Sequence, residues 1–358
     1  MVETFKILAI NPGSTSTKIA VFENEKELFR QNIEHSSDEL AKYNSIAEQY
    51  DFRKEAVLSF LATNHVSVDD LSAVVGRGGS LPPVKGGAYH INDALVERLR
   101  YNPISEHAAN VASLIAYEIA SSAGIPSFIY DATTVDELDD IARITGMPVI
   151  PRASICHTLN MRAVARRYAK DYGKKYKELK LIVTHIGGGI TSSLHQGGRM
   201  IDIVSDDEGP FSPERAGMVH GRLLIDACYS GKYDHQTMSK MLRGKGGLVA
   251  YLGTNSALEV IERIKNGDKE AELVFRAMAY QIAKSIGELA TVVQGKVDGI
   301  ILTGGLAYSE LLTNWIKNNV EFIASVTIYP GENELESLAL GALRVLRGEE
   351  TAHEYDLG

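Results

Sequence analysis

The stretch FKILAINPGSTSTKIAVF, residues 5–22, predicts a strand, a turn of small polar residues and a second strand. The turn, NPGSTSTK, holds one glycine, four hydroxyl side chains and one lysine. Small residues let a ligand approach the backbone, and free N–H groups, hydroxyls and an ammonium bind phosphate well. The turn matches neither GxxxxGK[ST] nor GxGxxG, and a strand follows it instead of a helix. It indicates a phosphate site, with an ordinary β-hairpin as the alternative.

Composition is that of an ordinary globular protein. The chain has 358 residues, enough for two domains, and is 44% hydrophobic and 23% charged. Its net charge of -9 disfavours nucleic acid and anionic membranes as partners. Cys156 and Cys228 form no disulfide framework or CxxC pair, and no apolar stretch approaches the ~20 residues of a membrane span. With no signal pattern at the start of the chain, we expect a cytoplasmic protein.

Strands and helices alternate along the chain, which predicts an α/β fold. Helices are expected over residues 48–64, 92–100, 105–122, 154–172, 222–229, 257–266, 270–293 and 332–347. Further strands are expected over residues 71–76, 126–130, 181–185, 299–303 and 325–329. A second strand–turn–strand unit, LIVTH followed by IGGGITSS, starts about 175 residues after the first. The repeat indicates a duplicated α/β unit.

The duplication predicts two domains, residues 1–150 and residues 151–334. A closing helix within residues 335–358 is expected to pack back on the first domain. If the two halves face each other, the two turns border one cleft, and clefts between domains are common ligand sites.

Three turns have the composition of phosphate loops, at residues 11–18, 187–193 and 304–306. Each follows a buried apolar strand, and α/β folds bind ligands at the carboxyl ends of strands. Together they favour a site for nucleotide phosphates. The alternative is that each glycine serves only a tight turn with positive φ.

Two arginines and an aspartate stand where anions could bind. Arg77 ends a strand within GRGG, and Arg222 follows His220-Gly221. A guanidinium so placed can bind a carboxylate or phosphate through two hydrogen bonds, although either arginine could equally lie on the surface. Asp131 ends a strand, and taken alone it is best interpreted as the N-cap of a following helix.

Glu332, Glu334 and Glu336 cluster at the predicted start of the last helix. Carboxylates there complement the helix dipole, and one of them could also hold Mg²⁺, directly or through water. The histidines have no HExxH or paired-ligand spacing, so a zinc site is not expected. Cys156, within a predicted apolar helix, is expected to serve packing.

In combination these motifs resemble the acetokinase family of acetate and butyrate kinases, within the superfamily of acetate and sugar kinases, Hsp70 and actin. The resemblance covers nearly the whole chain in order and spacing. It rests on ILAINPGSTSTK (7–18), GRGG (76–79), DAT (131–133), THIGGG (184–189), FSPE (211–214) with GR (221–222), LTGG (302–305) and PGENEL (330–335). The opening turn, the run of three glycines and PGENE are most similar to the butyrate kinases.

The resemblance implies a duplicated actin-like, ribonuclease H-like fold with ATP in the cleft between its domains. It implies Mg²⁺-assisted, reversible transfer of phosphate from ATP to butanoate, giving butanoyl phosphate and ADP. The implied catalytic residues are Arg77, Asp131 and Arg222. Those implied for the nucleotide are Asn11, Ser14, Thr15, Ser16, Lys18, His185, Gly187, Gly188, Gly189, Gly304, Gly305 and Leu306. Asn11 and Glu334 match positions linked with Mg²⁺.

Two departures from the acetate kinases affect the expected mechanism. Ala153 stands where those enzymes carry a histidine that contacts the transferred phosphoryl group, while His157 matches a second histidine. Gly188 replaces an asparagine of their phosphate loop. We expect backbone N–H groups and Arg152, counted here as a fourth catalytic residue, to take the place of the missing histidine.

The chemistry agrees with these residues. A carboxylate approaching the γ-phosphate brings like charges together, at about 4 kcal/mol per unit pair at 4 Å and an effective dielectric constant of 20. Two arginines and Mg²⁺ offset that repulsion. Because the acceptor is already ionised at neutral pH, no general base is required, so Asp131 is better interpreted as positioning Mg²⁺ or an arginine.

Two alternatives remain open at this point. Within the same enzyme class, the substrate could be acetate, propionate or a branched-chain acid. In another class, the chain could be an Hsp70-like or actin-like ATP-dependent binding protein, although no peptide-binding domain follows. A homo-oligomer, dimeric or larger, is expected from the family resemblance only.

Overall fold

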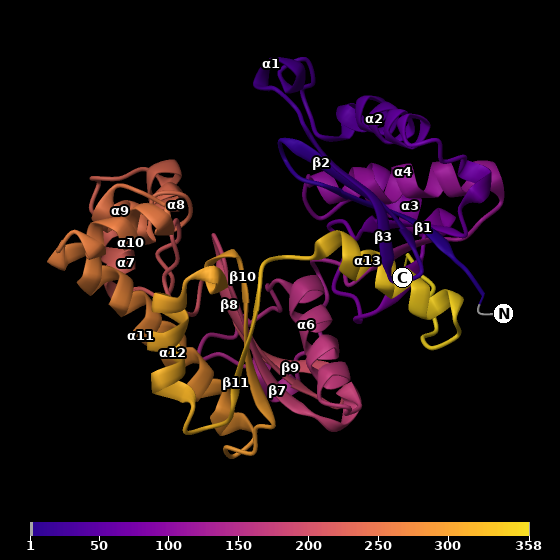
Figure 1. Ribbon diagram of the computed structural model, residues 1–358. Helices are drawn as coiled ribbons and strands as arrows, with labels where there is room; N and C mark the ends of the chain where they lie inside the picture. Colours follow the sequence, from indigo (N-terminus) through magenta and orange to yellow (C-terminus); the bar gives the residue numbers. More distant parts are fainter. Residues whose placement is uncertain (1–2, 358) are drawn as a thin grey trace. The chain divides into compact units, whose positions relative to one another are not determined.

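The computed structural model describes residues 3–357 as an α/β protein that divides into two compact units (Figure 1). Unit 1 consists of Met1–Asp136 and Asn333–Gly358, and unit 2 of Glu137–Glu332. The closing helix therefore groups with the first half of the chain. The division falls after residue 136, whereas the sequence placed it near residue 150.

The segment after residue 136 joins unit 2 through specific contacts. Leu138 packs in a small cluster with Met200 and Ile203. The backbone N–H of Asp139 donates to the carbonyl of Ile201 (2.9 Å), and the buried Arg162 pairs with Glu137 (2.8 Å). No change in composition marks this point, which is why the sequence placed the division later.

Unit 1 is built on a six-stranded sheet in the order β3-β2-β1-β4-β6-β5. The first three strands are antiparallel, and β1, β4 and β6 are parallel. The central strands are continuous apolar runs because both of their faces are buried. The strands are β1 (Lys6–Pro12), β2 (Ser16–Glu23), β3 (Lys26–Glu34), β4 (Ala73–Arg77), β5 (Ala88–His90) and β6 (Ser127–Tyr130).

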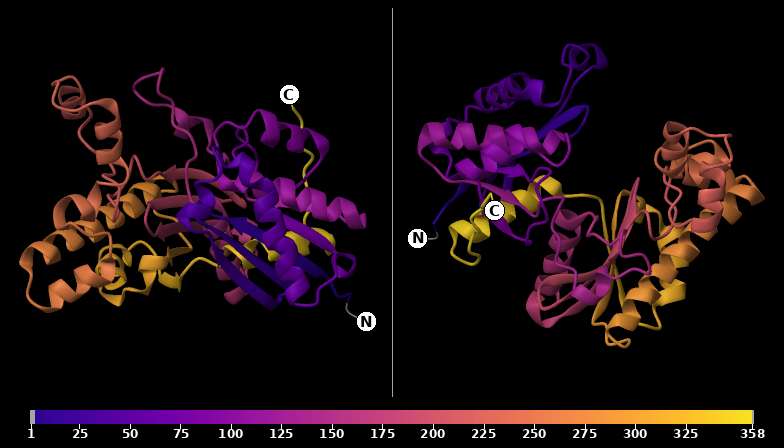
Figure 2. Two further views of the ribbon diagram at one scale, coloured as in Figure 1. Left: turned by 90° about the horizontal axis from the view of Figure 1, so that it is seen from above. Right: turned by 180° about the vertical axis from the view of Figure 1, so that it is seen from behind.

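Helices cover both faces of this sheet. Helix α4 packs on β4, where Gly76 is needed because a Cβ there would lie 2.8 Å from the carbonyl oxygen of Ala112. Helix α13 packs on β1 and β4, beside strands that precede it by more than 250 residues (Figures 1 and 2). The helices of unit 1 are α1 (Ser37–Leu40), α2 (Tyr50–Thr63), α3 (Asp93–Tyr101), α4 (Ala108–Ala123) and α13 (Glu334–Leu346), with 3₁₀ turns η1 (Ala47–Gln49) and η2 (Val68–Asp70).

Unit 2 repeats the same strand order, β11-β10-β7-β8-β9. Three antiparallel strands are again followed by two parallel ones, so β7, β8, β9, β10 and β11 correspond to β1, β2, β3, β4 and β6. This repetition confirms the predicted duplicated α/β fold. The strands are β7 (Lys180–Ile186), β8 (Ile190–Gln196), β9 (Arg199–Val204), β10 (Gly299–Gly304) and β11 (Val326–Pro330).

The long helix α11 lines the main core of unit 2 and packs against α12 and the sheet (Figure 1). Helix α6 covers β7 and β10, within a second cluster. The helices are α5 (Asp140–Arg143), α6 (Thr158–Asp171), α7 (Gly221–Cys228), α8 (His235–Leu242), α9 (Gly247–Leu252), α10 (Ala257–Lys265), α11 (Lys269–Val292) and α12 (Glu310–Val320), with 3₁₀ turns η3 (Tyr176–Glu178) and η4 (Gly305–Tyr308).

Two predicted helix starts are wrong by a few residues, with consequences for the site. Helix α6 begins at Thr158, so Cys156 lies ahead of the helix and not within it. Helix α13 begins at Glu334, so Glu332 lies in the preceding loop. Glu332 is therefore not part of the helix, and its Oε1 contacts His185 Nε2 (3.0 Å).

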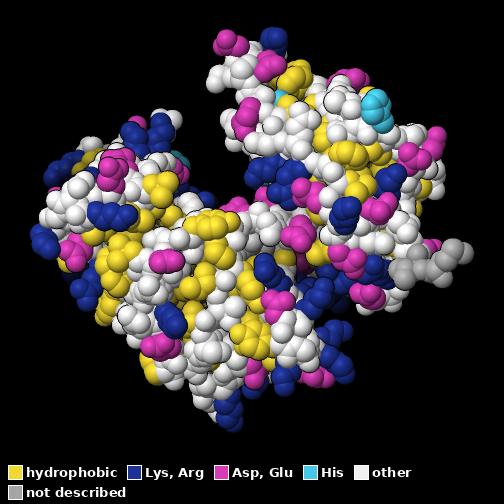
Figure 3. Space-filling view, viewed as in Figure 1, with side chains coloured by type: hydrophobic (Ala, Val, Ile, Leu, Met, Phe, Trp, Pro, Cys, Tyr) yellow, Lys and Arg dark blue, Asp and Glu magenta, His cyan; other side chains and the backbone are white. Residues whose placement is uncertain are grey.

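The surface carries charges of both signs. Lys and Arg side chains alternate with Asp and Glu side chains over the visible face of each unit (Figure 3). Among residues 3–357, no helix is long and apolar enough to cross a bilayer.

Candidate active site

The opening turn, residues 11–18 (hereafter the unit 1 turn), connects β1 to β2. Asn11 pairs with Lys18 across the two strands, and the N–H of Gly13 donates to the carbonyl of Ser16 (2.9 Å). The side chains of Ser14, Thr15 and Lys18 are exposed. The turn is thus a true hairpin, as the alternative interpretation held, and its donors remain available. Phosphate binding at this turn stays a prediction.

Three predicted site residues meet at the carboxyl ends of β1 and β4. The amide nitrogen of Asn11 donates to Glu334 Oε2 (2.5 Å), and Arg77 Nη1 pairs with Glu334 Oε1. Asn11 is the last residue but one of β1, Arg77 ends the neighbouring parallel strand β4, and Glu334 is the first residue of α13. Arg77 Nε is buried and has no hydrogen-bond partner among residues 3–357. The cluster therefore keeps one unused donor.

Asp131 directly follows β6, the next parallel strand of the same sheet. It is buried, its φ is +42°, and its Oδ1 accepts a hydrogen bond from the N–H of Gly87 (2.8 Å). The N-cap interpretation is wrong, because the next helix along the chain starts only at Asp140. Positive φ is uncommon in a non-glycine residue and costs energy, and strained backbone of this kind clusters at functional sites. Asn11, Arg77 and Asp131 therefore lie at or next to the ends of three adjacent strands of unit 1.

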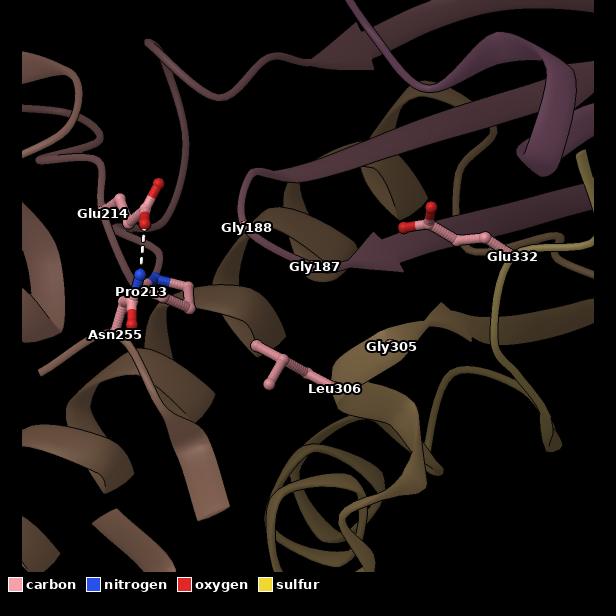
Figure 4. Close-up of a pocket in the computed structure, with 8 residues that line it drawn as sticks. All are labelled: Gly187, Gly188, Pro213, Glu214, Asn255, Gly305, Leu306 and Glu332. Carbon is pink, nitrogen blue, oxygen red and sulfur yellow. Dashed lines mark hydrogen bonds between the residues drawn. The ribbon is translucent and has the colours of Figure 1, made fainter. Parts of the chain in front are cut away.

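In unit 2 the equivalent strand ends border a pocket of about 270 Å³ (Figure 4). The turns after β7 and β10 form one side, because these strands are parallel neighbours. Glu214 accepts a hydrogen bond from the side chain of Asn255 on the opposite side. The lining residues are Gly187, Gly188, Pro213, Glu214, Asn255, Gly305, Leu306 and Glu332.

The sequence predicted four residues of this lining: Gly187, Gly188, Gly305 and Leu306. Glu214 appeared only within a quoted motif, and Glu332 only as a helix-start carboxylate. Asn255 was missed, and no motif around it could have identified it. It lies in the loop between α9 and α10 and reaches the pocket only through the tertiary fold.

Close packing explains why most of these turn positions are glycine. A Cβ at Gly187 would lie 2.9 Å from His185 Nε2, and one at Gly189 would collide with the guanidinium of Arg215. Gly304 has φ +91°, and a Cβ there would lie 2.5 Å from the carbonyl oxygen of Ile186. Gly188 differs, since a Cβ there meets no heavy atom within 4 Å. Packing against the Cβ position therefore does not explain the glycine at residue 188.

His185, at the end of β7, is almost fully buried and bound at both ring nitrogens. Nδ1 contacts Asn160 Oδ1 (3.1 Å), and Nε2 contacts Glu332 Oε1 (3.0 Å). The ring of His157 stacks on it with centroids 3.8 Å apart. These partners hold the ring of His185 in place against Gly187, so that the ring packs against the turn.

The remaining two predicted arginines lie in different surroundings in unit 2. Arg222 is exposed on the first turn of α7, with no hydrogen bond or ion pair to any residue in the described part of the chain. Arg152 is engaged by Asp202 (3.1 Å), Glu208 (3.1 Å) and the carbonyl of Ala142 (2.8 Å). These partners give Arg152 a structural task, and its catalytic role stays a prediction.

Comparison with known proteins identifies the family of the chain. The model of the acetokinase family matches residues 152–329. A protein of Clostridium botulinum (strain Alaska E43 / Type E3) named probable butyrate kinase is 50% identical over 354 residues, covering 98% of this chain and all of that protein. A second such protein, from strain Eklund 17B / Type B, is equally similar.

Solved structures with the same fold include the acetate kinase of Porphyromonas gingivalis, with a TM-score of 0.78 and 19% identity over 96% of this chain and all of that one. A propionate kinase from Francisella tularensis has a TM-score of 0.74 and 16% identity, covering 94% and 98% of the two chains.

The fold is thus that of the duplicated actin-like carboxylate kinases. The chain belongs to the acetokinase family, which makes it a phosphotransferase with a carboxyl group as acceptor. Nothing in these matches supports the Hsp70-like alternative.

Proposed function

We propose that this protein is a butyrate kinase, which catalyses butanoate + ATP = butanoyl phosphate + ADP. The observation that carries the proposal is the cluster at the ends of β1 and β4, where Glu334 joins Asn11 to Arg77. The 50% identity with proteins named probable butyrate kinase supports butanoate as the acceptor.

We assign the nucleotide to the pocket of unit 2. Gly305 and the side chain of Leu306 offer an uncharged surface for the adenosine, and Gly188 offers its backbone N–H toward the phosphates, because the N–H of Gly187 donates to the carbonyl of Gly189 (3.0 Å). His185 packs against this turn, held by Asn160 and Glu332. Glu214 and Asn255, joined by their hydrogen bond, bound the other side.

We assign the divalent metal of this family as Mg²⁺, held by Asn11 and Glu334. Both offer oxygen atoms, since the Asn11 amide nitrogen is already used by Glu334 and leaves Oδ1 for another partner. Among residues 3–357, no group of three or more His, Cys, Asp or Glu could hold a metal alone. Mg²⁺ usually takes one or two protein carboxylates together with substrate phosphates and water, so this donor set fits. When bound, the ion neutralises charge on the phosphate oxygens.

The protein's own part in the reaction is positioning and charge neutralisation. Glu334 holds Arg77 in place, and the unused Nε donor of Arg77 is free for an anionic group. We assign Arg77 and Arg222 to the charge of the phosphoryl group and the attacking carboxylate. Asp131 orients this end of the sheet through its bond to Gly87, and no proton transfer is required of it.

The direct test measures acyl phosphate formation. The protein is incubated with MgATP, hydroxylamine and one straight or branched acid of two to six carbons, and hydroxamate is measured. We expect the highest kcat/KM with butanoate, with acids one methylene shorter or longer lower by about 10–200-fold. A preference for acetate, propionate or a branched acid would correct the acceptor. Absence of hydroxamate with every acid would refute the kinase proposal.

A further inference from the structure

Arg53, on the first turn of α2, is a fully buried arginine that lies behind the unit 1 turn. Its side chain is 0% exposed. Nη1 donates to the carbonyl of Ser16 (2.8 Å) and to Thr17 Oγ1 (3.0 Å), and Nη2 donates to the carbonyl of Ser14 (3.0 Å). Nε donates to Gln49 Oε1 (3.0 Å). One side chain therefore binds three residues of the turn, Ser14, Ser16 and Thr17.

Every acceptor around this guanidinium is neutral. No carboxylate of the described chain forms an ion pair or hydrogen bond with it, and burial alone lowers the pKa of Arg53. The guanidinium nevertheless stays protonated at any physiological pH. Burying a charge without a partner of opposite sign is expensive, and such groups are rare in proteins unless they have a role.

His35, which shares the partner Thr17 with Arg53, does not supply the missing negative charge. Its Nε2 contacts Thr17 Oγ1 (2.7 Å), and both residues are buried. Burial and then the charge of Arg53 lower the pKa of His35, so it is neutral at pH 7. The positive charge of Arg53 thus remains unbalanced on the protein side.

The contacts also fix the orientation of the turn. The carbonyls of Ser14 and Ser16 face Arg53, and the carbonyl between them, on Thr15, accepts from the backbone N–H of His35 (2.8 Å). In a planar trans peptide the N–H points opposite to the C=O, so the N–H of Thr15 points away from Arg53. Negative carbonyl ends therefore face inward, toward the guanidinium.

We propose that Arg53 positions the unit 1 turn for a phosphoryl group and that the charge of this group balances the buried guanidinium. The inference rests on the proposed function, because it takes the turn to be a phosphate site of the kinase. Arg53 does not touch the ligand. It acts through the backbone carbonyls that it binds and through its electric field, which a low-dielectric interior screens only weakly.

The test compares three variants with the wild type. Arg53→Met removes the charge at similar length, and Arg53→Lys retains it. Arg30→Met is the matched control, because Arg30 is an exposed arginine of the same unit that pairs with Glu27 on the surface. Binding is measured with the Mg²⁺ complex of the ATP analogue AMPPNP, and separately with butanoyl phosphate, because either compound could supply the phosphoryl group.

We expect Arg53→Met to weaken binding of at least one of these probes by about tenfold or more, and Arg53→Lys to recover most of that affinity. The affinity of Arg53→Met for these probes should also depend less steeply on salt concentration than that of the wild type. Arg30→Met should bind as the wild type does. In turnover assays, Arg53→Met should change the KM for the phosphoryl donor more than the KM for butanoate.

Wild-type affinity of folded Arg53→Met for both probes would overturn the inference. If Arg53→Met does not fold, the test uses Arg53→Lys, because lysine keeps the positive charge. A tenfold loss of affinity of Arg53→Lys for both probes would then overturn the role of charge. Affinity near that of the wild type would support that role. These results are independent of the hydroxamate assay. A wild-type protein without kinase activity would refute the proposed function. An active wild type together with unchanged probe affinity in Arg53→Met would refute only this inference.

Discussion

The first turns of the two sheets occupy the same topological position and differ in almost every chemical respect. The unit 1 turn is rich in hydroxyls, ends in an exposed lysine and is bound from behind by a buried arginine. The unit 2 turn, residues 187–189, is bare glycine backbone above a histidine held by two partners. Duplication preserved the strand order and let the two turns diverge. The unit 1 turn exposes a charge and hydroxyl groups, whereas the unit 2 turn exposes closely packed glycine backbone.

The predicted catalytic arginines Arg77 and Arg222 also differ between the two units, in the partners that hold their side chains. Arg77 of unit 1 is fixed by Glu334, whereas Arg222 of unit 2 is exposed and has no hydrogen bond or ion pair within residues 3–357. An arginine without protein partners is free to bind substrate, so the comparison makes Arg222 the sharpest catalytic prediction.

The largest expected effect is that of Arg222→Ala, which should lower kcat by about two to three orders of magnitude because a charge opposite the transferring phosphoryl group is lost. Since Arg222 is exposed and has no hydrogen bond or ion pair in the described part of the chain, the thermal unfolding midpoint should stay within about 1 °C of the wild type. Steady-state kinetics and calorimetry measure both quantities. Wild-type turnover would remove Arg222 from the mechanism and leave Arg77 and Arg152 as the predicted catalytic arginines.

The next largest effect tests whether the turns of unit 2 require glycine because of close backbone packing. Gly304→Ala should destabilise the protein by about 3 kcal/mol, because φ is +91° and the new Cβ would lie 2.5 Å from the carbonyl oxygen of Ile186. Gly305→Ala is the matched control, since a Cβ there meets nothing within 4 Å. Urea unfolding of the two variants should differ clearly. Equal stabilities would show that the turn tolerates side chains and that its glycines have another purpose.

The smallest expected effect concerns a buried histidine of unit 2. Burial, followed by the charges of Arg162 and Arg166, lowers the pKa of His195 to about 3. The unfolded state, with a pKa near 6.5, therefore binds the proton first, so this contribution to stability is complete above that pH and is lost as pH falls. Between pH 7 and pH 5 the loss amounts to about 2 kcal/mol.

The replacement His195→Gln removes this titration. Its unfolding free energy should fall about 2 kcal/mol less than that of the wild type between pH 7 and pH 5, as followed by urea unfolding at each pH. His35→Gln in unit 1 provides the comparison, because burial and Arg53 lower the pKa of His35 in the same direction. Equal pH dependence in wild type and His195→Gln would mean that His195 takes up its proton without unfolding unit 2.

Much of the fold follows from local pattern. The central strands are apolar on both faces, so β1, β4, β7 and β10 stand out as continuous hydrophobic runs. Strand β3 was not predicted, because it is an exposed edge strand with few buried side chains and no alternation. Short helices such as α8 and α9 give too few residues for a helical period to be recognised.

The site was predictable only where residues belong to strand ends. Asn11 and Arg77 follow apolar runs, and such ends meet at one edge of a parallel sheet. Asn255 carries no such signal because it depends on tertiary packing of loops. Arg53 has the local pattern of a solvated helix charge, and only the fold reveals that it is buried. The positive φ of Asp131 is likewise a property of the folded chain.

The return of the chain to unit 1 has a consequence for biosynthesis. Unit 2 is one continuous segment, Glu137–Glu332, whereas unit 1 lacks α13 until the ribosome has translated all of unit 2 as well. Glu334, which joins Asn11 to Arg77, is therefore synthesised after every residue of unit 2. A nascent or truncated chain that stops before Glu334 lacks the carboxylate on which the unit 1 cluster depends. Assembly of this cluster therefore requires that all of unit 2 has been translated.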